Sequence, residues 1–245
     1  MNVDKIKQLS HWIADANRIV FFGGAGCSTE SGIPDFRSGN GLYSKHYGQL
    51  SAETILSHSF FQKEPELFYD FYRKYLYFPN AVPNRAHKIL AKLEEQGKLL
   101  GIVTQNIDNL HQEAGSKNVK ELHGSLSRNY CSTCKVPYDT EDIISLEGVP
   151  RCECGGIIRP DIVLYEESLD SMVIEESLQM IYDADVLIVG GTSLAVSPAN
   201  SFIRYYRGNQ LALINLSSTP FDYKADLVIH EKLGDVLEQA YEGAL

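Results

Sequence analysis

Four of the five cysteines in this chain stand in two close pairs, and thiols paired in this way can hold a metal ion. Cys131 and Cys134 form a Cys-x-x-Cys pair, and Cys152 and Cys154 form a Cys-x-Cys pair. Four thiolates at this spacing are typical of a structural zinc site, which leaves no open position for catalysis. Without a signal-peptide pattern, metal binding is favoured over disulfides or redox work. The second pair is one residue short of Cys-x-x-Cys, so the geometry of the metal site stays open.

Histidine is the second residue type that could do chemistry, because it is the natural general base near neutral pH. Spacing does not choose among the seven histidines, and an isolated histidine is commonly structural or solvated. We favour His123, because the following Gly124 would open space beside its ring. The competing histidines are His11, His46, His58, His87, His111 and His230.

A glycine-rich segment, residues 23–28, follows a short apolar run and could bring backbone N–H groups close to a phosphate. The alternative is a plain tight turn. The third glycine of a G-x-G-x-x-G fingerprint would fall at Thr29, which disfavours a hydride-transferring dehydrogenase. Residues 31–38 continue with a proline, a carboxylate, an aromatic ring and a guanidinium. Such a loop could fold over a bound nucleotide.

Polar residues also follow other apolar runs that we expect to be strands. Residues 104–108 follow the run 99–103, residues 190–194 follow 186–189, and Asn215 follows 210–214. Ligands of open α/β sheets bind outside the carboxyl ends of the strands. The alternative for Asn106 or Asp108 is a helix N-cap. Together the segments would line one edge of a sheet with groups that suit a dinucleotide.

The elements that must position these residues form an alternating pattern. Short apolar runs predict buried strands at residues 18–22, 99–103, 186–189, 210–214 and 227–229. Helical periodicity predicts helices at residues 2–16, 84–96, 171–182, 198–207 and 231–242. Strands alternating with helices predict an α/β fold with a doubly wound parallel sheet.

Two stretches depart from that alternation. Residues 40–80 are rich in Tyr and Phe, and we interpret them as a helical insertion whose aromatic side chains form a core, in preference to a ligand-binding box. Residues 126–158 contain the paired cysteines and show little hydrophobic pattern. This segment can bury little apolar surface, so it needs a cross-link such as a bound metal ion to stay folded.

Composition limits the class of function. The chain has 245 residues, a formal net charge of −10, 44% hydrophobic and 22% charged residues, which are ordinary values for a globular protein. The negative charge disfavours nucleic-acid binding and suits a basic partner such as a lysine-rich peptide. No apolar run is long enough for a membrane helix, and no targeting pattern is visible. We expect a cytoplasmic protein, with a monomer as the default oligomeric state.

The ensemble of motifs resembles the sirtuins, a family of NAD-dependent protein-lysine deacylases. The resemblance spans residues 24–215 in family order and includes residues 24–28, 32–37, 105–108, 123–124 and 191–194, Asn215 and both cysteine pairs. It implies a Rossmann-like NAD-binding domain made of residues 1–39, 80–125 and 159–245. It also implies a smaller domain made of a helical insertion, residues 40–79, and a zinc-binding insertion, residues 126–158.

The resemblance further implies NAD-dependent deacetylation. In the family the acetyl oxygen attacks the ribose carbon that carries nicotinamide, nicotinamide leaves, and a histidine, here His123, acts as general base on a ribose hydroxyl. Asn106 and Asp108 would handle the ribose and the carboxamide. The implied NAD-binding residues are Gly24, Ala25, Gly26, Ser28, Asp35, Phe36, Arg37, Gln105, Asn106, Ile107, Asp108, Gly191, Thr192, Ser193, Asn215 and Leu216. The acetylated peptide would add as a strand beside Val163, Leu164, Tyr165 and Glu166, with Val196 in contact.

Three departures from the family pattern bear on specificity. Cys27 replaces an aliphatic residue, the second cysteine pair is shortened, and residues 164–167 read Leu-Tyr-Glu-Glu where many relatives read Phe-Phe-Gly-Glu. Relatives that remove succinyl groups carry Tyr-x-x-Arg, whereas here Arg73 lies four residues after Tyr69 and should point elsewhere on a helix. We therefore expect a neutral acyl group. Mono-ADP-ribosyl transfer, long-chain deacylation and a non-catalytic NAD sensor or zinc-stabilised interaction module remain the alternatives.

Overall fold

A central parallel sheet organises the molecule. The structure is a computed structural model that describes residues 3–36, 41–44 and 50–245. Within these residues the sheet runs in the order β3-β2-β1-β7-β8-β9, and every neighbouring pair is parallel. Counted in chain order this is 3-2-1-4-5-6, the order of the doubly wound dinucleotide-binding fold. The strands are Ile19–Gly23, Leu99–Thr104, Val119–Glu121, Val186–Gly190, Leu211–Ile214 and Leu227–Ile229 for β1, β2, β3, β7, β8 and β9.

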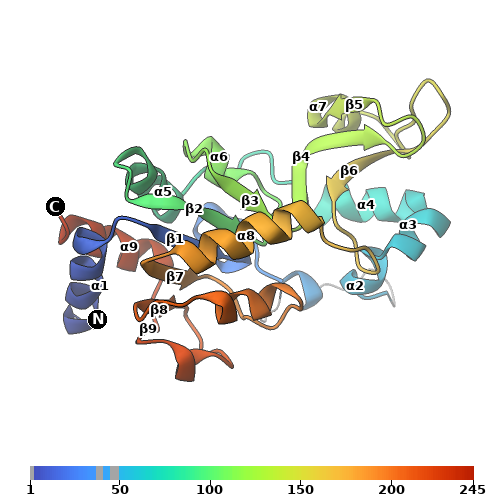
Figure 1. The fold of residues 1–245 in the computed structure, drawn as a ribbon. Helices are drawn as coiled ribbons and strands as arrows, with labels where there is room; N and C mark the ends of the chain where they lie inside the picture. The colour runs from blue at the N-terminus through green and yellow to red at the C-terminus, as the bar shows by residue number, and fades with distance from the viewer. Residues whose placement is uncertain (1–2, 37–40, 45–49) are drawn as a thin grey trace.

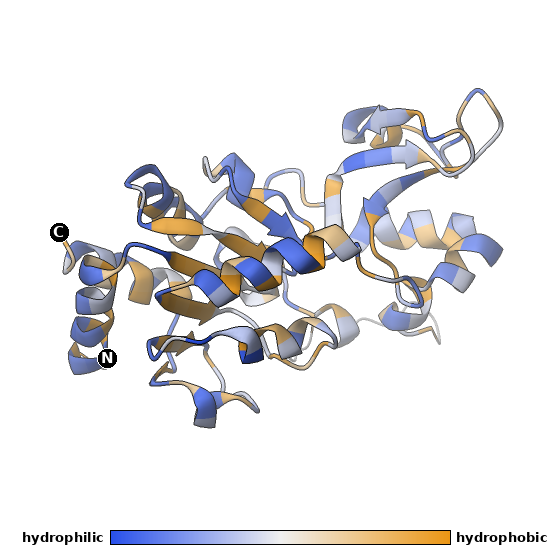
Figure 2. Ribbon diagram, viewed as in Figure 1, coloured by the Kyte–Doolittle hydropathy of each residue, from blue (hydrophilic) through white to orange (hydrophobic). Residues whose placement is uncertain are grey.

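Two hydrophobic cores lie on the two faces of this sheet, because alternate strand residues point to opposite faces. Phe21 and Ile188 face one core, whose helices are α1 (Val3–Asp15), α5 (Arg85–Glu95) and α9 (Leu233–Glu242). Phe22 and Val189 face the other core, covered by α8 (Ser171–Asp183) and a 3-10 helix, Ala199–Tyr205. Figure 1 shows α8 crossing the sheet, and Figure 2 shows apolar strands behind helices whose outer faces are polar.

Capping side chains fix where two of the covering helices begin. Asp170 accepts hydrogen bonds from the N–H groups of Met172 and Val173 at the start of α8. Asn84 accepts from the N–H groups of Ala86 and His87 at the start of α5, and the His87 side chain accepts the N–H of Asn84 in return. This reciprocal arrangement is a capping box, which satisfies backbone donors that a helix leaves free.

A second, three-stranded sheet lies near the carboxyl ends of the parallel strands of the first sheet (Figure 1). Its order is β5-β4-β6, with antiparallel strands Pro137–Asp139, Gly124–Cys131 and Ile158–Ile162. Figure 1 shows it next to α2 (Ala52–Ile55), α3 (His58–Lys63) and α4 (Pro65–Tyr75), with α7 (Thr140–Ile144) at its outer end. The remaining helix, α6 (Leu110–Glu113), follows β2. Both chain ends lie at the opposite end of the molecule (Figure 1).

The aromatic segment is a core, as the sequence predicts. Its fully buried rings come from α3 and α4 and pack with Leu126 and Ile162 of the small sheet. The buried rings are Phe61, Phe68, Tyr69, Phe71 and Tyr72. The segment is therefore held by the same strands that carry the cysteine pairs.

The expected strands and helices are confirmed to within a few residues, except that the segment 198–207 forms a 3-10 helix. The elements β3, β4, β5, β6, α6 and α7 were not expected, and in β3 Lys120 and Glu121 interrupt the apolar pattern. No helix in the described ranges is long and apolar enough to span a membrane.

Candidate active site

A large cleft opens at the carboxyl ends of β1, β2, β7 and β8, where ligands of such sheets bind. Its volume is about 1120 Å³, and its far wall is formed by residues 162–169, which end β6 and follow it. Small-molecule sites usually measure about 300–1,000 Å³, so the cleft has room for a dinucleotide. The expected site residues that line it are Gly24, Ala25, Gly26, Asp35, Phe36, Gln105, Asn106, Ile107, His123, Val163, Leu164, Tyr165, Glu166, Gly191, Thr192, Ser193, Val196, Asn215 and Leu216.

The glycine-rich loop after β1 packs directly on the loop after β7. Gly26 donates its N–H to the Gly191 carbonyl oxygen at 2.8 Å. A Cβ atom on Gly26 would lie 2.8 Å from backbone atoms of Gly191, and one on Gly24 would lie 2.8 Å from Thr192. Glycine is therefore required here for the contact between the two loops, and this contact shapes the floor of the cleft.

Thr192 and Asn215 hold the neighbouring strand ends together. The Thr192 N–H donates to Asn215 Oδ1 at 2.9 Å, and Asn215 Nδ2 donates to the Thr192 carbonyl at 2.7 Å. Gln105 Nε2 donates to Thr192 Oγ1 at 3.0 Å, which links the loop after β2 to the same point. The side chain of Asn215 is thus engaged in orienting the loop after β7 as well as lining the cleft.

Ser28, Asn106 and Asp108 form a buried hydrogen-bonded group behind the cleft. Ser28 Oγ donates to Asp108 Oδ2 at 2.5 Å, and Asn106 Nδ2 donates to Ser28 Oγ at 3.1 Å. Burial raises the pKa of Asp108, while the hydrogen bonds from Ser28, the Leu110 N–H and Asn106 oppose that rise.

Ser28 and Asp108 line a smaller cavity of about 40 Å³, which shares Ala25, Phe36 and Asn106 with the cleft. Asp108 Oδ1 also accepts the N–H of Leu110 at 3.0 Å, at the start of α6. The N-cap residue of α6 is Asn109, so neither Asn106 nor Asp108 is the N-cap, although the Asp108 side chain bonds the first turn. Arg37 lies outside the described residues.

His123 lines the cleft with a defined tautomer. Its Nδ1 lies 2.8 Å from the Gln105 carbonyl oxygen. Because a carbonyl oxygen only accepts, Nδ1 carries the proton and Nε2 is left with a free lone pair. Burial lowers the pKa of His123, although the bond to Gln105 opposes that shift. The ring is therefore neutral at pH 7 and can accept a proton.

The reason given for favouring His123 needs correction. Gly124 begins β4 with φ of 74°, and a Cβ atom there would clash with the Asp161 carbonyl oxygen. The glycine thus permits the close approach of β4 and β6, and it does not open space beside the histidine ring. No other histidine in the described part of the chain lines the cleft.

Hydrogen bonds hold residues 163–166 in place along the far wall of the cleft. Val163 donates its N–H to the His123 carbonyl at 3.0 Å, and Tyr165 exchanges backbone hydrogen bonds with Leu56 and His58. The Tyr165 hydroxyl also bonds the Tyr43 hydroxyl, whose ring packs edge-on against Phe36. The wall expected to meet peptide is thereby tied to the segment that carries Phe36.

An ion pair between Arg159 and Glu167 supports this wall. Arg159 contacts Glu167 through two nitrogens, at 2.6 and 3.0 Å, and Glu167 also accepts the Leu164 N–H at 2.8 Å. Burial alone would raise the pKa of Glu167, but these bonds and one with His58 lower it to about 2. Glu167 is therefore an anion compensated by Arg159.

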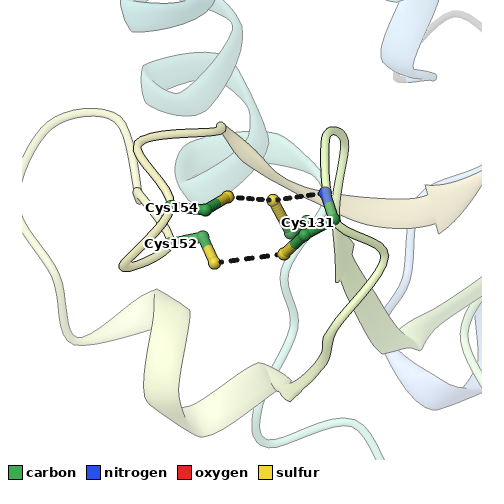
Figure 3. A group of neighbouring side chains, drawn as sticks. Cys131, Cys152 and Cys154 are labelled. Atoms are coloured by element: carbon green, nitrogen blue, oxygen red, sulfur yellow. Dashed lines mark hydrogen bonds between the residues drawn. The ribbon is translucent and has the colours of Figure 1, made fainter.

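The four paired cysteines converge on one point. Their sulfur atoms all lie within 4.8 Å of one another, with Cys131–Cys154 and Cys134–Cys152 each at 3.5 Å (Figure 3). A tetrahedral zinc ion with zinc–sulfur bonds of about 2.3 Å needs sulfurs at about this separation. The N–H groups of Thr133 and Cys134 point at the Cys131 sulfur. The shortened pair therefore still reaches the common site, and the residues fit a zinc ion.

Sequence reasoning missed part of the cleft wall. Ser217, Ser218, Thr219, Glu231 and Lys232 line the cleft near the ends of β8 and β9. The rule that identified Asn215 would have found them, because Ser217, Ser218 and Thr219 follow the carboxyl end of β8, and Glu231 and Lys232 follow that of β9.

Arg73 is not among the described residues that line the cleft, although it lies on the same helix face as Tyr69. Its guanidinium donates to the carbonyls of Leu146 and Gly148 at 2.8 and 2.6 Å. It also covers the ring of Tyr69, whose hydroxyl bonds the Ile158 carbonyl. Among the described residues lining the cleft there is no arginine that could bind an acyl carboxylate.

Comparisons with known proteins agree on one family. A family model described as "Sir2 family" matches residues 24–198. An NAD-dependent protein deacetylase of Clostridium acetobutylicum is 57% identical over 239 residues, which cover 96% of this chain and 98% of that protein.

Solved structures extend the agreement to the fold. A Sir2 structure with a deacetylated peptide and 3′-O-acetyl-ADP-ribose has a TM-score of 0.88 and 38% identity over 97% of each chain. Another, with a peptide and NAD⁺, has a TM-score of 0.84 and 38% identity over 99% of this chain and 98% of that one.

Proposed function

This chain belongs to the Sir2 family, the sirtuins, and from that membership we propose how its residues carry out the reaction. The protein is an NAD-dependent protein-lysine deacetylase, which transfers the acetyl group to ADP-ribose and releases nicotinamide. The assignment of roles rests on one observation: His123 lies in the cleft as a neutral ring, with its proton on Nδ1 bonded to the Gln105 carbonyl and Nε2 free to accept a proton.

His123 acts as the general base. Nε2 accepts a proton from a ribose hydroxyl, and the Gln105 carbonyl holds the Nδ1–H so that the ring keeps this orientation as it becomes charged. The same carbonyl stabilises the protonated ring, since it accepts a hydrogen bond from a positive group.

NAD supplies an activated bond between its ribose and nicotinamide when bound. The loops after β1 and β7, with Gly24, Gly26, Thr192 and Ser193, hold the phosphates, because these residues border the cleft at the carboxyl ends of the strands. Ala25, Asp35 and Phe36 lie on the nicotinamide side, and the Ser28–Asn106–Asp108 group orients the carboxamide. Gln105, Ile107, Gly191, Asn215 and Leu216 complete the nucleotide site.

Acetylated peptide binds along residues 163–166, with Val196 on the facing side of the cleft. The nucleotide part of the molecule is residues 1–39, 80–125 and 159–245, and the smaller part is residues 40–79 and 126–158. The peptide backbone adds to this wall as a strand, in the β-augmentation mode.

The protein acts as a monomer and binds neither nucleic acid nor membranes. Its cysteines form no disulfide bonds, which suits a cytoplasmic location.

Zinc binding by the four cysteines is structural. Four thiolates complete the coordination of the ion and leave no position for water or substrate. The reaction therefore proceeds through His123 and its neighbours, with zinc fixing the small sheet.

Mass spectrometry of an acetyl-lysine peptide, with and without NAD, tests the reaction. We expect NAD-dependent loss of acetyl together with equal amounts of nicotinamide and O-acetyl-ADP-ribose. ADP-ribose attached to a protein acceptor without acetyl loss would instead establish mono-ADP-ribosyl transfer. Loss of only long acyl chains would establish a long-chain deacylase, and NAD binding without nicotinamide release would establish a sensor.

A further inference from the structure

The substrate wall ends in a glutamate with an unusual backbone. Glu166 has φ of 74°, in the left-handed region that glycine adopts freely and that costs energy for other side chains. Glutamate lacks the short polar side chain that helps Asn and Asp tolerate this region. Such residues persist where their surroundings hold them, and they gather at binding sites.

Two hydrogen bonds fix the carboxylate of Glu166. Oε2 accepts the Ser59 N–H at 2.9 Å, and Oε1 accepts the Ser59 hydroxyl at 2.9 Å. A carboxylate offers about four acceptor positions, so both oxygens can still accept another donor. The residue is exposed and lines the cleft.

Glu166 also differs from its neighbour in charge balance. The Glu167 carboxylate is bound by two Arg159 nitrogens, whereas no lysine or arginine in the described part of the chain pairs with Glu166. The two bonds from Ser59 are neutral donors and leave the negative charge in place. The wall therefore carries one anchored, uncompensated carboxylate at a fixed point.

We propose that Glu166 is a specificity-determining residue, which favours acetylated peptides with an arginine or lysine two or three residues from the acetyl-lysine. The inference rests on the proposed function, which places the acetyl-lysine beside His123. Val163 donates to the His123 carbonyl, and Glu166 is three residues further along the wall. The wall turns at Glu166, where the Glu167 N–H donates to the Leu164 carbonyl, while an extended peptide advances about 3.3 Å per residue, so a peptide residue two or three positions from the acetyl-lysine comes beside the carboxylate.

Arginine should be preferred to lysine at this position. A guanidinium can give two parallel N–H groups to the two Glu166 oxygens, whereas an ammonium acts as a point charge. Because Ser59 has already ordered the carboxylate, little further conformational entropy is lost on binding.

The test measures kcat/KM on peptides that differ only by one arginine or alanine, moved from three residues before to three residues after the acetyl-lysine. At one position two or three residues away, we expect wild type to use the arginine peptide about two- to fivefold better, as exposed ion pairs allow. The preference should shrink as salt is raised.

Variants separate the charge from the anchoring. Glu166→Gln removes the charge at nearly constant shape and should bring the arginine-to-alanine ratio close to one. Glu166→Gly suits the left-handed backbone and should do the same if the glutamine variant folds poorly. Ser59→Ala is the matched control: it keeps the charge and one of the two bonds, so part of the preference should remain.

The experiment distinguishes failure of the proposed role of Glu166 from failure of the proposed function. Equal use of arginine and alanine peptides by an active wild-type enzyme overturns the role of Glu166 alone, as does a preference that survives in Glu166→Gln. If wild type deacetylates no peptide in the series, including the alanine one, the proposed function fails and this inference with it.

Discussion

At the scale of single residues, the hydrogen bond from His123 Nδ1 to the Gln105 carbonyl decides which ring nitrogen is basic. Replacing His123 with alanine removes the general base, so we expect turnover to fall by about 10²- to 10⁴-fold. NAD binding should be nearly unchanged, because the phosphate loops are untouched. Nicotinamide release gives the rate and calorimetry gives the affinity, with the exposed His11→Ala as control. Near wild-type turnover would remove His123 from the mechanism.

Arg73 bears on the choice of acyl group. Its guanidinium is already bound to the Leu146 and Gly148 carbonyls and is not among the residues of the cleft wall. No arginine among the described residues of the cleft would meet a succinyl carboxylate, so we expect kcat/KM to be higher for acetyl-lysine than for succinyl-lysine on the same peptide. Faster removal of succinyl would contradict this interpretation.

Two buried histidines lie behind the site and should make the fold sensitive to acid. Burial lowers the pKa of His87 to about 4, and burial together with the nearby His87 lowers that of His111 to about 3. The pKa of histidine in an unfolded chain is about 6.5, so below that pH the unfolded chain binds protons that the buried histidines of the folded chain do not bind. The free energy of unfolding should therefore fall as the pH drops from about 6.5 toward 4.

Urea unfolding between pH 7 and pH 4.5 measures this dependence. His111 has no hydrogen-bond partner at either ring nitrogen, so His111→Phe should keep the packing and bind about one proton fewer on unfolding. The exposed His11→Phe is the matched control and should keep the wild-type slope. An unchanged slope in His111→Phe would show that His111 is not neutral in the folded protein.

At the scale of elements, the contact between the loops after β1 and β7 depends on Gly26. A methyl group there meets backbone atoms of Gly191 at 2.8 Å, and backbone cannot move aside as a side chain can. We expect Gly26→Ala to raise the KM for NAD at least about tenfold, because the phosphate-binding floor must open. Gly32→Asn is a control in the same loop, since Gly32 has φ of 86° and open space around it. Equal KM values in the two variants would refute the packing argument.

The parallel strands β1, β2, β7, β8 and β9 could be predicted from sequence because they are mostly buried on both faces and their residues are almost continuously apolar. β3 could not, because it is a short edge strand whose residues are only half buried. The strand-end rule located the residues around the cleft. It could not show that the Asn215 amide is bonded to Thr192, or that Gly124 serves the pairing of β4 with β6. Those facts depend on contacts between segments far apart in the chain.

At the scale of the whole molecule, the zinc site and the parallel sheet have separate cores. Cys131, Cys152, Ile143 and Ile158 form a very small cluster of their own, which is too little to hold the strands together. We expect Cys131→Ser to lose zinc and to become sensitive to proteolysis within residues 126–158, while the parallel sheet remains folded. Metal analysis and limited proteolysis measure both effects, with Cys27→Ala as the matched control that keeps its zinc. A zinc-free variant that resists proteolysis would refute the structural role.

The strand order has a consequence for the behaviour of this protein at high concentration. The parallel sheet ends in β3 and β9 and the small sheet in β5 and β6; β3, β9 and β5 have three residues each, and β6, which leads into the cleft wall at residues 163–166, has five. Long exposed edges invite pairing with other chains and lead to aggregation. Under the proposed function, this enzyme would accept a foreign peptide as a strand in its cleft and would meet that hazard in every reaction cycle. Short outer edges would then direct strand addition to the cleft, where the peptide can be processed and released.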